Sequence, residues 1–112
     1  MDKKTYTKKQ VDALVRDYAR HLRDEHNTPI EHVFVFGSYA KHRARPWSDI
    51  DVCIVSPIFK HEDRLTYLWT RRRDKDVDAM IAPVGFTPED FRNTTTSPLV
   101  HEVRTTGEAV SL

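Results

Sequence analysis

Hydrophobic residues recur every three or four positions from Thr7 to about Asp24, and this spacing predicts an amphipathic helix. Thr7 and Gln10, three residues apart, are typical of a capping box at the start of such a helix. The run "HVFVF" at residues 32–36 is rich in aromatic and β-branched side chains and stops at Gly37. It predicts a buried strand, after which we expect a short helical turn.

The segment from Ser38 to about Arg43 is expected to form that turn. The run "SDIDVCIVS" at residues 48–56 predicts a second strand that ends at Pro57. Because side chains alternate between the faces of a strand, the two faces of this strand differ in chemistry. One face carries aliphatic residues and the other carries two carboxylates; the two sets are Ile50, Val52 and Ile54, and Asp49, Asp51, Cys53 and Val55.

The second half of the chain predicts two longer elements. The stretch from His61 to about Arg73 fits a surface helix with a narrow apolar stripe, and "RRRDKD" at residues 71–76 would be its solvated end. The run "VDAMIAP" at residues 77–83 predicts a third strand. The apolar stripe consists of Leu65, Leu68 and Trp69, and one face of the strand would carry Asp78, Met80 and Ala82.

Polar caps mark the remaining elements. Thr87 and Asp90 indicate a second capping box that opens a short helix. After the polar connector "NTTTSP", the pattern predicts a last helix from Ser97 to just before Gly107, and "EAVSL" predicts an edge strand. The mixed order of helices and strands predicts an α/β (α+β) fold, a small mixed β-sheet with helices packed on it, in a single domain over residues 1–112.

The charge balance excludes a strong long-range field. Eighteen basic and seventeen acidic residues give a formal charge of +1, so only local patches would attract a nucleic acid or an anionic membrane. Cys53 is the sole cysteine, which excludes an internal disulfide and a multi-cysteine metal site.

No apolar stretch approaches the roughly 18 residues of a membrane span, and no apolar signal region follows the basic start. We therefore expect a cytoplasmic protein.

Asp49 and Asp51 are the first candidates for chemistry. Their side chains would leave one face of the strand roughly 6.5–7 Å apart along the chain, so their charges repel each other unless they share a cation. Mg²⁺ or Mn²⁺ suits these hard oxygens, and Mg²⁺ is usually held by one or two carboxylates and substrate phosphates. A third carboxylate would bridge two such ions or accept a proton; Asp78 is the best candidate and Asp76 the reserve.

Gly37 and Ser38 provide the other half of such a site. A glycine at the end of a buried strand lets the backbone approach a phosphate, and the amides of the next turn and the Ser38 hydroxyl can donate to it. Lys41, Arg43 and Arg45 would add positive charge near a triphosphate, although such residues are also common in surface turns. Each fragment is weak by itself, and the order and spacing of the fragments carry the prediction.

The segment "GSYAKHRARPWSDIDVCIVS" at residues 37–56 resembles the signature of the DNA polymerase beta-like nucleotidyltransferase superfamily, G-S-x-A-x-G followed by a short spacer and S-D-x-D. Within the superfamily, the chain is most similar to the minimal nucleotidyltransferase group, whose closing helix and strand resemble "SPLVHEVRTTGEAV" at residues 97–110. The resemblance implies residues that bind the nucleotide phosphates, Gly37 and Ser38, and carboxylates that bind the metals, Asp49, Asp51 and, as the third, Asp78.

Two residues of this segment raise separate questions. His42 occupies the position of the second glycine of the signature, and because histidine is among the non-glycine residues enriched at positive φ, the turn can survive with some strain. Trp47, directly before Ser48, is expected to pack over the domain, with stacking on a nucleobase as the alternative. The three glycines of the chain fit neither a P-loop nor a dinucleotide-binding fingerprint.

The resemblance implies a Mg²⁺-dependent nucleotidyltransferase that moves a nucleoside monophosphate, AMP from ATP, onto a hydroxyl of a partner macromolecule. Minimal members act in several cases as antitoxins that adenylylate a tyrosine of a HEPN-type toxin, so such a toxin is the expected protein partner. The alternative is a non-catalytic nucleotide-binding antitoxin or sensor that acts by covering its partner. A nucleic-acid polymerase or tailing enzyme is disfavoured by the near-neutral charge.

Overall fold

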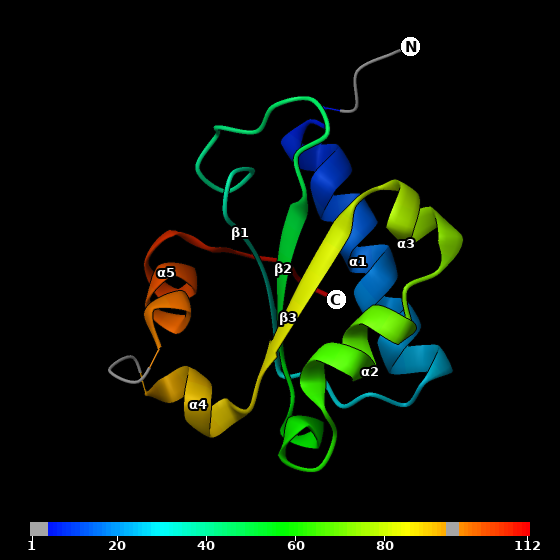
Figure 1. Ribbon diagram of the computed structural model, residues 1–112, viewed down its shortest axis with the longest axis vertical. Helices are drawn as coiled ribbons and strands as arrows, with labels where there is room; N and C mark the ends of the chain where they lie inside the picture. Colours follow the sequence, from blue (N-terminus) through cyan, green and yellow to red (C-terminus); the bar gives the residue numbers. More distant parts are fainter. Residues whose placement is uncertain (1–4, 94–96) are drawn as a thin grey trace.

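Four strands form one mixed sheet in a computed structural model that describes residues 5–93 and 97–112. The strands are β1 (His32–Phe36), β2 (Ile50–Val55), β3 (Ile81–Phe86) and β4 (Glu108–Ala109). Their order across the sheet is β3-β2-β1-β4 (Figure 1). β1 pairs antiparallel with both β2 and β4, whereas β3 runs parallel to β2. This arrangement confirms the predicted small mixed sheet.

Helices cover both faces of the sheet. They are α1 (Lys8–Glu25), α2 (Arg64–Thr70), α3 (Asp74–Asp78), α4 (Pro88–Arg92) and α5 (Pro98–Thr106), with a short 3-10 helix η1 (Pro57–Lys60). Figure 1 shows α1, α2 and α3 on one side of the sheet and α4 and α5 on the other. None of the helices in the described part of the chain combines the length and the hydrophobicity needed to cross a membrane.

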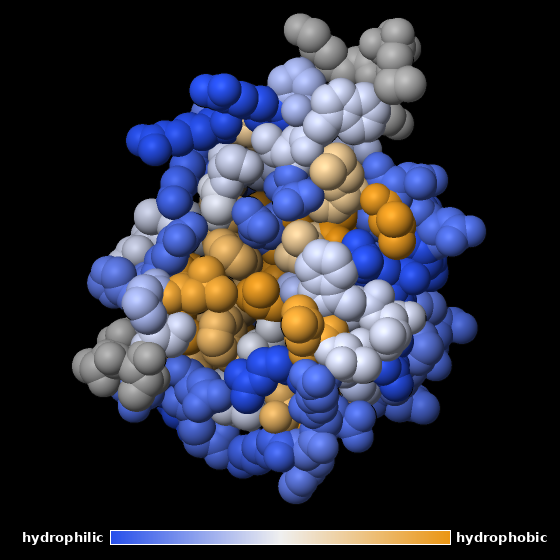
Figure 2. Space-filling view, in the orientation of Figure 1, coloured by the Kyte–Doolittle hydropathy of each residue, from blue (hydrophilic) through white to orange (hydrophobic). Residues whose placement is uncertain are grey.

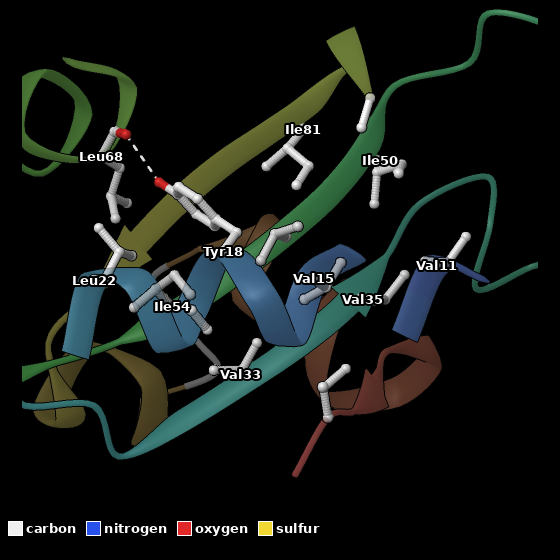
Figure 3. Close-up of a cluster of buried hydrophobic side chains, with 14 of the residues drawn as sticks. Val11, Val15, Tyr18, Leu22, Val33, Val35, Ile50, Ile54, Leu68 and Ile81 are labelled. Carbon is white, nitrogen blue, oxygen red and sulfur yellow. Dashed lines mark hydrogen bonds between the residues drawn. The ribbon is translucent and has the colours of Figure 1, made fainter. Parts of the chain in front are cut away.

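The larger hydrophobic core lies between α1 and the sheet (Figure 3). Val15, Tyr18 and Leu22 of α1 are fully buried there. The Tyr18 hydroxyl donates to the Leu68 carbonyl of α2 at 2.8 Å, so the polar tip of this buried ring is satisfied. The predicted alternation along β2 is confirmed, because this core contains Ile50, Val52 and Ile54, and the smaller core beneath α4 and α5 contains Cys53 and Val55.

The predicted N-caps at Thr7, Thr87 and Ser97 are confirmed, and of the two predicted capping boxes the one at Thr7 is confirmed. The hydroxyls of Thr7, Thr87 and Ser97 each accept a hydrogen bond from the backbone amide three residues later, at 3.1–3.3 Å. Gln10 completes the capping box of α1 by accepting from the Thr7 amide at 2.8 Å. The middle of the polar connector before α5, residues 94–96, lies outside the described residues.

The third strand begins later than its sequence pattern predicts. Ile81 is the first residue of β3, so the strand predicted from residue 77 is wrong, and Asp78 is the last residue of α3 instead. α3 forms because the Asp76 carboxylate accepts from the backbone amide at the helix start, at 2.9 Å. Met80, with φ +64°, then redirects the chain into β3.

The helix predicted from His61 to about Arg73 is shorter in the structure. Asp63 caps α2 by accepting from the Leu65 amide at 3.2 Å, so residues 61–63 form the link between η1 and α2 instead of helix. Leu68 is buried as the apolar stripe predicts, whereas Leu65 is 59% exposed.

The sequence predicted that residues 71–76 form the solvated end of a helix, and this prediction is wrong. Asp76 is only 2% exposed, and the Arg73 guanidinium donates to its two carboxylate oxygens at 2.9 and 3.0 Å. The same guanidinium donates to Asp17 of α1 at 2.8 Å. This contact between residues far apart in the sequence holds α3 against α1.

Side chains cover the outer edge of β3. Since β3 lies at the end of the sheet, alternate carbonyls point away from β2. The three donors are Arg72, Trp69 and Arg64, which bind the carbonyls of Ile81, Pro83 and Gly85 at 3.3, 2.9 and 3.1 Å respectively. An edge satisfied in this way is a poor template for pairing with another chain.

Candidate active site

A single helical turn follows β1, as predicted. The Arg43 amide donates to the Ser38 carbonyl at 2.8 Å and the His42 amide to the Tyr39 carbonyl at 3.3 Å. These two bonds are the pair that ends a helix in the Schellman motif, in which the residue at the position of His42 adopts a left-handed conformation. His42 has φ +57°, so the expectation that histidine takes over the glycine conformation of the signature is confirmed.

Gly37 places this turn against Asp51. Gly37 has φ +73°, and the preceding residue, Phe36, pairs with Asp51 in the sheet. A Cβ atom at residue 37 would collide with Asp51 Oδ2 and would lie 3.0 Å from Asp51 Cγ, so only glycine fits. The backbone that is predicted to bind phosphate therefore lies beside the carboxylate that is predicted to bind metal.

Asp49 and Asp51 lie at the start of β2, at the same end of the sheet as this turn. Asp49 is exposed and Asp51 is partly buried. The pKa of Asp51 is raised to about 6, chiefly because burial disfavours the charged carboxylate, and secondly because Asp49 and Glu102 carry negative charge nearby. The Lys41 cation acts in the opposite direction. The two aspartates therefore repel each other, as a shared cation site requires.

Asp78 is not brought to these carboxylates. It is exposed at the end of α3, and it is not among the charges that shift the pKa of Asp51. The reserve choice, Asp76, is bound by Arg73 away from solvent. The residue of β3 directly beside Asp51 is Ala82. The register therefore places a methyl group where the sequence predicted the third carboxylate, and the role of Asp78 stays a prediction.

Glu102 is a site residue that the sequence did not single out, and it pairs with Lys41, one of the three basic residues that the sequence placed near a triphosphate. The Lys41 ammonium lies 3.1 Å from a Glu102 carboxylate oxygen, and both charges act on Asp51. Lys41 belongs to the basic loop that the sequence identified, whereas nothing local marks Glu102. Its position depends on how α5 packs against the sheet, where Val103 is fully buried.

The carboxylates fit a magnesium ion better than a soft transition metal. Asp49 and Asp51 offer two hard oxygen ligands, and Mg²⁺ is commonly held by one or two carboxylates together with substrate phosphates. In the described part of the chain, no group of three histidine, cysteine, aspartate or glutamate side chains is placed to hold a metal by itself. The remaining ligands of an ion at this site would therefore come from the substrate and from water.

A hydrophobic strip lies on the same face of the sheet as Asp51. Figure 2 shows hydrophobic residues gathered in a hollow between α5 and β3, with hydrophilic residues around it. The partly buried members of this strip are Phe34, Val84, Phe86 and Leu99. A large acceptor could therefore rest on apolar surface close to the carboxylates.

Comparisons with known proteins show which family and which fold the chain resembles. The profile of the family described as nucleotidyltransferase domain matches residues 15–99. A solved structure from Sulfolobus solfataricus, provisionally assigned as a nucleotidyltransferase, is similar in fold, with a TM-score of 0.60 and 17% identity over 89% of this chain and 78% of that one. No curated protein matches the chain. Since the profile spans most of the chain, the chain belongs to the nucleotidyltransferase domain family, in the DNA polymerase beta-like superfamily, a family of nucleotidyl-transferring domains.

Proposed function

We propose that this protein is a Mg²⁺-dependent nucleotidyltransferase that moves AMP from ATP onto a hydroxyl of a partner macromolecule. The contact between Gly37 and Asp51 carries this proposal. It brings backbone amides that can bind a triphosphate within reach of a carboxylate pair that can bind a divalent cation. A merely structural turn would have no need of an acidic side chain packed against its glycine.

The transfer forms a bond between the acceptor oxygen and the α-phosphorus of ATP. The bond from that phosphorus to the oxygen shared with the β-phosphate breaks, and pyrophosphate leaves with the electron pair. Asp49 and Asp51 would hold a divalent cation, which would supply positive charge to neutralise the phosphates. The amides after Gly37 and the Ser38 hydroxyl bind phosphate oxygens, and Lys41 adds a positive charge beside them. We assign the proton of the acceptor hydroxyl to the Glu102 carboxylate of α5, whose charge acts on Asp51.

The partner we propose is a HEPN-type toxin, with a tyrosine hydroxyl as acceptor, as expected for the minimal nucleotidyltransferase group. The hydrophobic strip between α5 and β3 supports a macromolecular acceptor, because it offers apolar contact area next to Asp51. The protein would then act as the antitoxin of a toxin–antitoxin pair, in the cytoplasm.

The test uses the purified protein, Mg²⁺, ATP labelled at the α-phosphate, and a lysate of the host. We expect a labelled protein band with the wild type and none with Asp51→Asn, whose fold is checked by circular dichroism. Label transferred by a folded Asp51→Asn variant would exclude Asp51 from the machinery. Label on RNA instead of protein would assign the activity to a tailing enzyme.

A second function, nucleotide binding without transfer, is favoured by one observation. Ala82 stands beside Asp51, where a third carboxylate would complete a two-metal site. In this case the protein would neutralise its partner by covering it. The two functions separate because Asp51→Asn and Asp49→Asn would still neutralise the partner if binding alone suffices, and would fail if transfer is required.

A further inference from the structure

Trp47 adopts a backbone conformation that is costly for its residue type. It has φ +69° in the turn Arg45–Ser48, which is closed by the Ser48 amide donating to the Arg45 carbonyl at 3.0 Å. The Ser48 hydroxyl also accepts from the Arg45 amide at 2.8 Å. Pro46 in the second position and positive φ in the third are the pattern of a type II turn, whose third position favours glycine or asparagine. A bulky aromatic residue is strained there.

Packing does not account for this strain. The Trp47 side chain is 47% exposed, so the prediction that it packs over the domain is only half met. Among residues 5–93 and 97–112, no hydrogen bond, ring stacking or cation–π contact involves its indole. Trp69 shows the contrast, because its indole N–H donates to Pro83 and its ring lies 4.1 Å from the Arg72 guanidinium. A strained residue without local compensation indicates a role toward a ligand.

The neighbours of Trp47 indicate the chemistry of such a ligand. Trp47 precedes Asp49 by two residues, so their backbones lie within about 7 Å of each other. The same loop begins at Gly37, beside Asp51, and carries the exposed side chains of Arg43 and Arg45. A loop that combines cations with an unpartnered aromatic face matches a nucleoside triphosphate, which combines anionic phosphates with a flat base.

We propose that Trp47 is the stacking surface for the nucleobase of the donor nucleotide. This inference rests on the proposed function and adds how the site holds the half of the nucleotide that the carboxylates and Gly37 do not reach. Stacking on an aromatic side chain tolerates any base, because every base has a π-face. Trp47 therefore gives the site affinity for nucleotides over plain polyphosphate without selecting adenine.

The test measures binding of two probes by calorimetry in the presence of Mg²⁺. One probe is an ATP analogue with a methylene group in place of the α,β-bridging oxygen, and the other is tripolyphosphate, which has no base. Trp47→Ala is expected to weaken binding of the ATP analogue about tenfold and to leave tripolyphosphate unchanged. Trp47→Tyr should stay within about threefold of the wild type, and Trp69→Phe is the matched control.

Trp47→Gly separates function from stability. Glycine relieves the positive φ, so we expect the melting temperature to rise by about 4 °C while binding of the ATP analogue falls as in Trp47→Ala. Equal affinity of wild type and Trp47→Ala for the ATP analogue would overturn the inference and leave the proposed function standing, as would equal losses for both probes. A wild type that binds neither probe would overturn both proposals.

Discussion

At the scale of single residues, the raised pKa of Asp51 makes the stability of the fold depend on pH. Its pKa is raised to about 6 from the usual value of 3.8 because the folded chain partly buries the carboxylate. Between these two pH values the folded state binds more protons than the unfolded chain, so stability falls as the pH rises through this range. We expect Asp51→Asn, measured with a chelator present, to melt at a higher temperature than the wild type at pH 8 and at the same temperature near pH 4. Thermal melts followed by circular dichroism test this.

Asp78→Asn is the matched control for that experiment, since Asp78 is exposed at the end of α3. It should show no gain at pH 8. An equal rise in the melting temperature of both variants at pH 8 would mean that the change in net charge, and not the burial of Asp51, causes the rise.

His42 offers a second residue-level prediction. Its φ of +57° costs a non-glycine residue about 1–2 kcal/mol; a glycine there would avoid this cost, but its greater freedom in the unfolded chain would cancel part of the gain. We expect His42→Gly to raise the free energy of unfolding by about 0.5–1 kcal/mol in urea titrations. Arg43→Gly, one residue later and without positive φ, should lower it. A loss of stability in His42→Gly would show that the imidazole makes a contact more valuable than the relief of strain.

At the scale of elements, the sequence predicted β1, β2 and α5 well because their signals are local. Alternating side chains and caps such as Ser97 act within a few residues. The start of β3 was missed because a distant contact decides it. Arg73 pairs with Asp76 and also reaches Asp17 of α1, 56 positions away in the sequence, so a helical turn outcompetes the strand. The residues of the predicted strand, 77–83, do not include any of the partners in these contacts, so their pattern could not reveal the helical turn.

This ion pair gives the prediction at the element scale. Because Asp76 is almost fully buried, Asp76→Asn would remove the buried one of the two carboxylates that bind the Arg73 guanidinium, leaving Asp17, and would deprive α3 of its carboxylate cap. We expect a loss of about 3 kcal/mol in the free energy of unfolding, measured by urea denaturation. Asp74→Asn in the same helical turn is exposed and should cost less than about 0.5 kcal/mol. Similar losses in the two variants would mean that the pair stabilises little.

At the scale of the whole molecule, the candidate site joins segments whose proximity only tertiary structure determines. The sequence placed Gly37 and Asp51 together because their spacing repeats a known signature. It could not place Glu102, whose contact with Lys41 depends on the packing of α5 against the sheet. Nor could it show that Ala82 lies beside Asp51, because that follows from the register of two parallel strands.

The register makes Ala82 the position at which the site can be completed. An aspartate there would place a third carboxylate beside Asp51, across a strand spacing of about 4.8 Å. Without divalent cations the added repulsion should lower the melting temperature of Ala82→Asp, and with Mg²⁺ the extra oxygen ligand should tighten metal binding roughly tenfold. Metal titrations followed by calorimetry measure this.

Ala82→Asn matches Ala82→Asp in shape but adds no charge, so it should bind Mg²⁺ only about as well as the wild type. If Ala82→Asp also transfers AMP faster than the wild type, the native site is catalytic and works with an incomplete set of carboxylates. If it binds Mg²⁺ more tightly but transfers nothing, the binding function gains support. Equal Mg²⁺ affinity in Ala82→Asp and Ala82→Asn would show that the metal does not sit at the Asp51 end of β2, and would remove the basis of both functions.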